Sequence, residues 1–121
     1  MISGGYDLVQ GSRNSVQLFD PSRPGHVCSL PHMVYSRNDH AAAGLTVCGG
    51  SGVGGHTCET FNPDSGHWRV SHHLTHRRRE HVMWESPEGP LVIGGSSQNT
   101  VEKLRYDGTT KETFPLLYSI E

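Results

Sequence analysis

The sequence predicts an all-β protein built from about three copies of a small antiparallel sheet. A glycine doublet recurs at intervals of 45 residues, and its copies are Gly4-Gly5, Gly49-Gly50 and Gly94-Gly95. A short β-prone run precedes each doublet, and a second run with alternating apolar residues follows it. The same spacing in the same context indicates a structural repeat, so function is expected on the loops between the strands rather than in one local motif.

The strands of each repeat are predicted in a constant order. The run before the doublet spans residues 1–3, 45–48 and 91–93. The run after it spans residues 15–21, 57–63 and 100–106, and turns of the Asp-Pro, Asn-Pro and Asp-Gly kind close it. Apolar side chains at every second position predict a strand with one buried face. Within this run, one aligned column holds Gln17, Glu59 and Glu102.

A third strand is expected after each turn. In the second repeat it carries a large aromatic residue, Trp68. Val27 occupies the same place in the first repeat, and Phe114 is the nearest counterpart in the third. We expect Trp68 to be a structural residue of its repeat.

A fourth segment begins with an Arg-x-x-His motif and leads into the next glycine doublet. The motif occurs twice, as Arg37-x-x-His40 and as Arg78-x-x-His81. Because these four residues keep their place in consecutive repeats, we expect them to be structural, as we expect of the glycine doublets. The order of segments divides the chain into units 1–36, 37–77 and 78–121, and the first unit lacks its opening strand.

Four short antiparallel strands in a unit of about 45 residues are typical of a blade of a β-propeller. The doublet, the alternating strand, the turn with an aromatic residue and the Arg-x-x-His motif together resemble kelch repeats over the whole chain. The resemblance implies a kelch-type propeller, and such domains mainly bind other proteins. Some are substrate receptors of ubiquitin ligases, and a family of copper oxidases shares the fold.

The number of units leaves the predicted propeller open. Propellers close with about four to eight blades, and this chain supplies about three. Two alternatives follow: the chain is a fragment of a larger propeller, or two copies related by a two-fold axis assemble a ring of six blades. Further blades or a second copy are needed in either case.

Composition restricts the classes of partner. The formal net charge of −2 argues against a dedicated nucleic-acid binder. No apolar run reaches 18 residues, so no membrane insertion is expected, and residues 1–5 do not resemble a signal peptide. The compartment is left open by these patterns.

The loop stretch from Ser71 to Arg79 carries the most chemistry. Three arginines beside three histidines suit a carboxylate-rich peptide or a phosphate. The alternative is that Arg78 or Arg79 is the structural arginine that donates to backbone carbonyls, within a solvated loop. The candidate residues for binding a partner are Tyr35, His56, His72, His73, His76, Arg77 and Arg79.

No metal or cofactor is expected. His72 and His76 have the i, i+4 spacing that holds a metal on a helix, but here the stretch is predicted to be strand and loop. A non-enzymatic protein-binding module is therefore the leading prediction. The alternatives are the recognition part of a ubiquitin-ligase adaptor and the propeller of a copper oxidase, although the tyrosines and histidines show no copper-binding constellation.

The three cysteines allow two interpretations. Cys48 ends one predicted strand and Cys58 begins the next, with nine residues between them, so the two are expected to face each other across a hairpin. They form either a disulfide or a pair of small buried thiols. A disulfide predicts an oxidising, extracellular environment, and free thiols predict the cytoplasm. Cys28 is then left without a partner within the chain.

Overall fold

The computed structural model describes residues 1–23, 25–96 and 98–112, and within them the chain is all-β. The predicted fold class is confirmed: the strands form antiparallel sheets, two of them four-stranded. The described residues include no helix long and apolar enough to cross a membrane. The predicted third unit extends to residue 121, but residues 113–121, with Phe114 among them, lie outside the described part.

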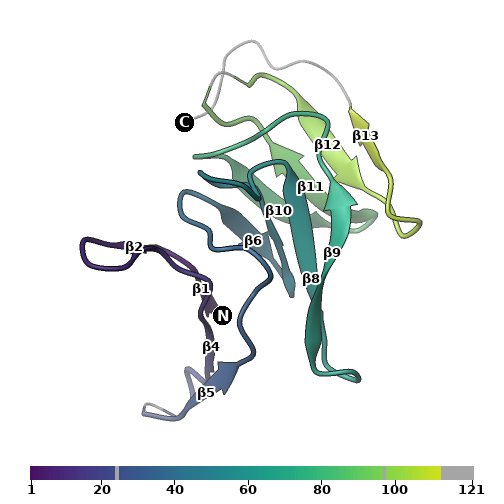
Figure 1. Cartoon of the computed structure of the whole chain (residues 1–121). Coiled ribbons are helices and arrows are strands. Elements are labelled where there is room, and N and C mark those ends of the chain that lie inside the picture. Colours follow the sequence, from purple (N-terminus) through teal and green to yellow (C-terminus); the bar gives the residue numbers. More distant parts are fainter. Residues whose placement is uncertain (24, 97, 113–121) are drawn as a thin grey trace.

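Three sheets follow one another along the chain, and we number them I to III. Sheet I has the order β1 (Ile2–Ser3), β4 (Val16–Phe19), β5 (Val27–Leu30). Sheet II has the order β6 (Ala41–Ala43), β7 (Thr46–Cys48), β8 (Thr57–Asn62), β9 (His67–His73). Sheet III has the order β10 (Val82–Ser86), β11 (Gly89–Ile93), β12 (Val101–Leu104), β13 (Thr110–Glu112). In Figure 1 sheet I lies at one end of the molecule and sheet III at the other.

A small hairpin was not expected from the sequence. β2 (Tyr6–Asp7) pairs with β3 (Gly11–Ser12) inside the loop that follows the first glycine doublet. Asp7 accepts hydrogen bonds from the backbone N–H groups of Val9 and Gln10, at 2.9 and 2.5 Å, and thereby closes the turn. The turn has no alternating flanks, which is why its sequence did not predict a hairpin.

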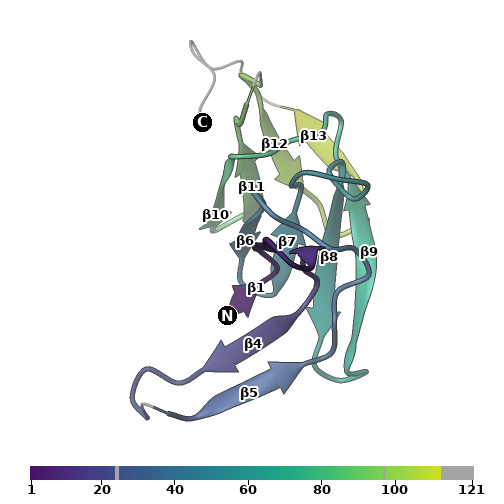
Figure 2. The ribbon, with the colours of Figure 1, turned by 60° about the vertical axis from the view of Figure 1, so that its left-hand side comes forward.

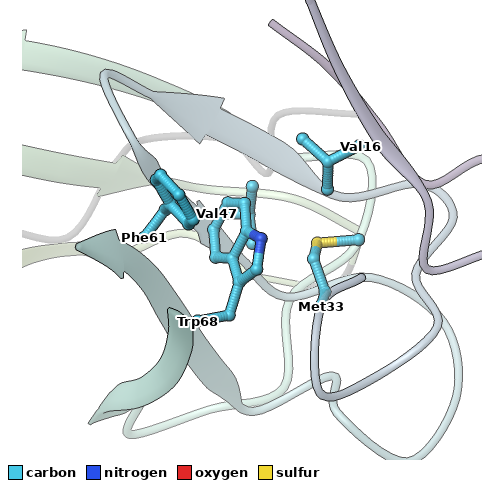
Figure 3. Close-up of a cluster of buried hydrophobic side chains, with 5 residues drawn as sticks. All are labelled: Val16, Met33, Val47, Phe61 and Trp68. Atoms are coloured by element: carbon cyan, nitrogen blue, oxygen red, sulfur yellow. The ribbon is translucent and has the colours of Figure 1, made fainter. Parts of the chain in front are cut away.

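Neighbouring sheets pack face to face through apolar side chains. Between sheets I and II, one buried cluster joins both sheets and the segment that links them, and Figure 3 shows its members: Val16, Met33, Val47, Phe61 and Trp68. The Trp68 ring lies 5.5 Å from the Phe61 ring, and its N–H donates to the Pro31 carbonyl at 2.9 Å. A second cluster joins sheets II and III and consists of Cys48, Cys58, Leu74, Val92 and Leu104.

The glycine doublets lie where consecutive sheets meet. Gly49 has φ of 73°, and a Cβ added there would lie 2.6 Å from Cε1 of His81. Gly4 repeats this geometry, with φ of 62° and His40 Cε1 at 2.7 Å. Only glycine combines a positive φ with so close an approach, so the recurrence of the doublet reflects one repeated contact between sheets.

Candidate functional site

A buried ion pair anchors the segment that enters sheet II. Arg37 and Glu59 are both fully buried, and Arg37 Nη2 lies 2.8 Å from Glu59 Oε2. The same guanidinium donates to the backbone carbonyls of Gly49, Gly54 and Thr57 at 2.9–3.0 Å. The two buried charges are tolerated because the guanidinium and the carboxylate each form hydrogen bonds to the backbone in addition to their contact with each other.

Sheet III repeats this arrangement. Arg78 Nη2 lies 2.9 Å from Glu102 Oε1, and Arg78 Nη1 donates to the carbonyls of Gly94 and Thr100. Burial alone would raise the pKa of Glu102. The backbone N–H of Thr75 and the Arg78 guanidinium outweigh that effect and hold the pKa below its usual value. The carboxylate is therefore ionised in the folded state.

The histidines of the two motifs face the preceding sheet. His40 Nε2 lies 2.9 Å from Ser3 Oγ of sheet I. His81 is buried against Gly49 of sheet II. Burial, assisted by the positive charge of Arg78, lowers the pKa of His81 to about 4, and burial also lowers that of His40. Both rings are therefore neutral at pH 7.

An open hollow of about 450 Å³ lies at the end of the sheets that carries the glycine doublets. Its lining consists of Gly50, Ser51, Gly52, Arg77, Arg78, Arg79 and Ser96. Arg78 is occupied by its buried partners, whereas Arg77 and Arg79 are exposed. Arg77 Nη1 donates to the Gly52 carbonyl at 2.6 Å, and Arg79 lies 3.9 Å from Glu80. These contacts hold two guanidiniums at the rim without burying them.

Exposed aliphatic side chains mark the tips of the loops that follow the glycine doublets. Leu8 and Val9 lie at the tip of the β2–β3 hairpin and are almost fully exposed. Val53 lies in the corresponding loop of sheet II and is also exposed. Apolar side chains at loop tips are suited to contact with another protein.

The structure does not bring all the predicted loop residues into the hollow. His72 and His73 lie in β9 rather than in a loop, which corrects the prediction. A bulge between Cys58 and Glu59 adds a residue to β9 and extends it, and His72 Nε2 lies 2.7 Å from the Arg105 carbonyl on the side of sheet III. None of the lining positions of the hollow is a histidine.

The remaining predicted loop residues pack against neighbouring segments. Tyr35 lies over Arg37, with 5.7 Å between the guanidinium carbon and the ring centroid. His76 Nε2 lies 2.9 Å from the carboxylate of Glu112 in β13. The ring of His56 lies 6.1 Å from that of His73. These residues shape the loop end, and the hollow itself carries only Arg77 and Arg79 from the predicted set.

Cys48 and Cys58 face each other across β7 and β8 and form a disulfide. We expect replacement of both by alanine to lower the free energy of unfolding by about 2–3 kcal/mol, because the bridge closes a loop of roughly ten residues. Urea denaturation measures the change. Cys28→Ala is the control, since Cys28 is exposed and unbridged, and its variant should stay within about 0.5 kcal/mol of the parent. Equal losses in both variants would contradict the role of the bridge.

The sequence interpretation missed the acidic members of the two ion pairs. Glu59 and Glu102 lie in one aligned column, and each follows its arginine by 22 or 24 residues. The column holds a neutral residue, Gln17, in the sheet for which the chain supplies no Arg-x-x-His motif. The column thus holds a glutamate where an Arg-x-x-His motif precedes it and a glutamine where none does. This correlation in the sequence was the signal for a buried ion pair.

Within residues 1–23, 25–96 and 98–112, no three His, Cys, Asp or Glu side chains form a group that would hold a metal ion. Compared with protein-family models and with curated proteins, the sequence matches none. The chain's own repeat and the geometry of its loop end therefore carry the functional argument.

Proposed function

We propose that the chain is a non-enzymatic protein-interaction module, built as part of a kelch-type propeller, that binds a carboxylate-bearing segment of a partner protein. The hollow at the loop end carries the proposal, because it places Arg77 and Arg79 beside backbone groups of Gly50–Gly52 on an accessible surface. Guanidiniums pair with carboxylates in bidentate geometry, and pairs of this kind are among the strongest hydrogen bonds in proteins.

The repeated contacts between sheets support the propeller part of the proposal. The N–H of Gly5 donates to the carbonyl of Arg37 at 2.7 Å, and the N–H of Gly50 donates to that of Arg78 at the same distance. Sheets II and III therefore follow their predecessors with one geometry, as blades of a propeller do. The disulfide favours an oxidising environment, and so argues for a module outside the cytosol rather than a cytosolic ubiquitin-ligase adaptor.

The net charge at the rim indicates how many negative charges the bound group carries. Glu80 lies 3.9 Å from Arg79 and neutralises part of its charge, and the charge of Arg78 is matched by Glu102. The rim therefore presents little more than one net positive charge. A single carboxylate flanked by apolar residues fits this surface better than a polyanion, because the apolar part can contact exposed Val53, which directly follows Gly52 of the lining.

Peptide binding tests the proposal. The probe is a fluorescent peptide with one glutamate between leucines, and binding is measured by fluorescence anisotropy. We expect Arg77→Ala/Arg79→Ala to raise Kd about tenfold or more, because hydrogen bonds to a charged group are lost. Arg23→Ala is the control, since Arg23 is exposed in a turn outside the hollow and pairs weakly with Asp20 at 3.7 Å.

Two results would contradict this function. One is an unchanged Kd in the double variant. The other is binding restricted to the same peptide with phosphoserine in place of glutamate, which would assign the hollow to a phosphate.

A further inference from the structure

One face of sheet I is exposed, although the residues at the equivalent positions of sheets II and III are buried. Ile2, Val47 and Val92 occupy the same place before their glycine doublets, and their exposed fractions are 58%, 0% and 0%. Sheets II and III bury this face against the sheet that precedes them. Sheet I keeps the side chains of a sheet interface, but no sheet of the described residues covers them.

A second position on this face, in β4, shows the same contrast in exposure. Phe19 corresponds to Phe61, and their exposed fractions are 51% and 8%. Their cross-strand neighbours are Val27 and Trp68, with 59% and 7% exposed. An apolar hollow of about 530 Å³ lies on this face, lined by Ile2, Gln17, Phe19, Asp20, Pro21, Gly25, His26 and Val27.

Sheet III presents the complementary face at the other end of the molecule (Figures 1 and 2). Val82 pairs with Ile93 across β10 and β11, as Ala41 pairs with Cys48 in sheet II. The pair in sheet II is covered by sheet III. In sheet III, the same face exposes 49% of Val82 and 56% of Trp84. An exposed tryptophan on a sheet face is a large unburied apolar area.

We propose that these two faces bind each other between two copies of the chain. Each copy then places its Ile2–Phe19–Val27 face on the Val82–Trp84–Ile93 face of the other, and a two-fold axis closes the pair through two identical contacts. The contact continues the packing between sheets I, II and III, in which this register is already used twice.

Side-chain volumes and charge favour a second copy as the occupant. Val27 stands in the register of Trp68, so it leaves space on its face, and Trp84 stands in the register of Ala43, so it projects a large ring from the other. Large and small residues are thus exchanged between the two faces, as close packing requires. Gln17 replaces the buried glutamate of the other sheets, so covering this face leaves no carboxylate without an arginine.

The backbone at the loop end of sheet I is open in the same way. A Cβ on Gly50 would lie 2.7 Å from the Asn38 carbonyl, and one on Gly95 would lie 2.7 Å from that of Arg79. At Gly5, no atom of the described residues lies within 4 Å of such a Cβ. Asn38 and Arg79 belong to the segments that enter sheets II and III, so the open space at Gly5 lies beside the β1 edge of sheet I and is separate from its uncovered face.

The oligomeric state of the 121-residue chain tests the proposal. Light scattering coupled to size-exclusion chromatography, at protein concentrations from 1 to 100 µM (roughly the range of ordinary dimer affinities), should give twice the mass of one chain at the upper end. Trp84 emission should shift to shorter wavelength over the same range, because the exposed ring becomes buried. A mass of one chain throughout, or a mass that rises without limit as in a filament, would overturn the closed pair.

Two variants identify the faces. Phe19→Glu and Trp84→Glu should each weaken dimerisation about tenfold or more, because a charge enters the apolar contact. Their mixture should contain more dimer than either variant alone, since the unaltered Val82–Trp84–Ile93 face of the first matches the unaltered Ile2–Phe19–Val27 face of the second. This mixed dimer is held by one contact, because the other contact carries both substitutions, so it should be weaker than the parent dimer. Tyr106→Glu is the control, because Tyr106 is fully exposed and lies on neither face. Circular dichroism confirms folding. A mixture with no more dimer than either folded variant alone would exclude head-to-tail binding.

Discussion

Replacing Arg37 by methionine should lower the free energy of unfolding by about 3–5 kcal/mol, the cost of leaving one member of a buried ion pair without its partner. The Glu59 carboxylate would stay buried without its counter-charge, and the carbonyls of Gly49 and Gly54 would lose their donor. A domain of this size is stabilised by roughly 6–18 kcal/mol, so the loss is a large fraction of the total. Urea denaturation followed by Trp68 fluorescence measures it.

A second variant separates lost charge pairing from lost packing. Glu59→Gln added to Arg37→Met removes the stranded carboxylate but keeps an oxygen that accepts from the N–H of Tyr35. We expect the double variant to be at least about 1 kcal/mol more stable than Arg37→Met alone. Arg23→Met is the matched control and should cost less than about 1 kcal/mol, because its ion pair is on the surface. The loss in the single variant Glu59→Gln is measured as well. If the loss in the double variant equals the sum of the losses in Arg37→Met and Glu59→Gln, Arg37 acts through packing alone.

The repeat predicted the strands because each one keeps a fixed place relative to the same marker in the sequence. A glycine doublet can be recognised without any tertiary knowledge, and β7 and β11 end directly before theirs. The propensity of the residues and the period of the pattern agreed in these segments, so the antiparallel sheets could be predicted. The hairpin of β2 and β3 was not predicted because its turn is defined by backbone N–H groups that donate to the Asp7 carboxylate, rather than by alternating apolar residues.

The site was harder to predict than the fold because its decisive contacts are long-range. A glutamate in a strand normally faces water, since burying a carboxylate is costly. Glu59 and Glu102 are buried only because an arginine from the preceding segment meets each one. Phe19 shows the opposite case. The alternating pattern predicts a buried face for its strand, yet Phe19 is exposed. Burial needs a covering sheet, and no local pattern in the sequence reports whether one is present.

Lowering the pH from 7 to 4 should destabilise the fold by about 3 kcal/mol through His81 alone. Burial lowers the pKa of His81 in the folded state to about 4, whereas in the unfolded chain it takes its usual value of about 6.5. Between these values the unfolded chain binds a proton that the folded chain does not. Stability is therefore complete above pH 6.5 and falls as the pH drops towards 4. His40 adds a loss of the same sign, since its pKa is also lowered.

Urea denaturation at half-unit pH steps measures this slope. His81→Asn removes the titrating ring with a side chain small enough to avoid Gly49, so it should flatten the pH dependence even though it lowers stability at pH 7. His67→Asn is the control, because His67 is exposed, and it should leave the slope unchanged. If the His81 variant keeps the full slope, the buried ring is not the group that takes up the proton.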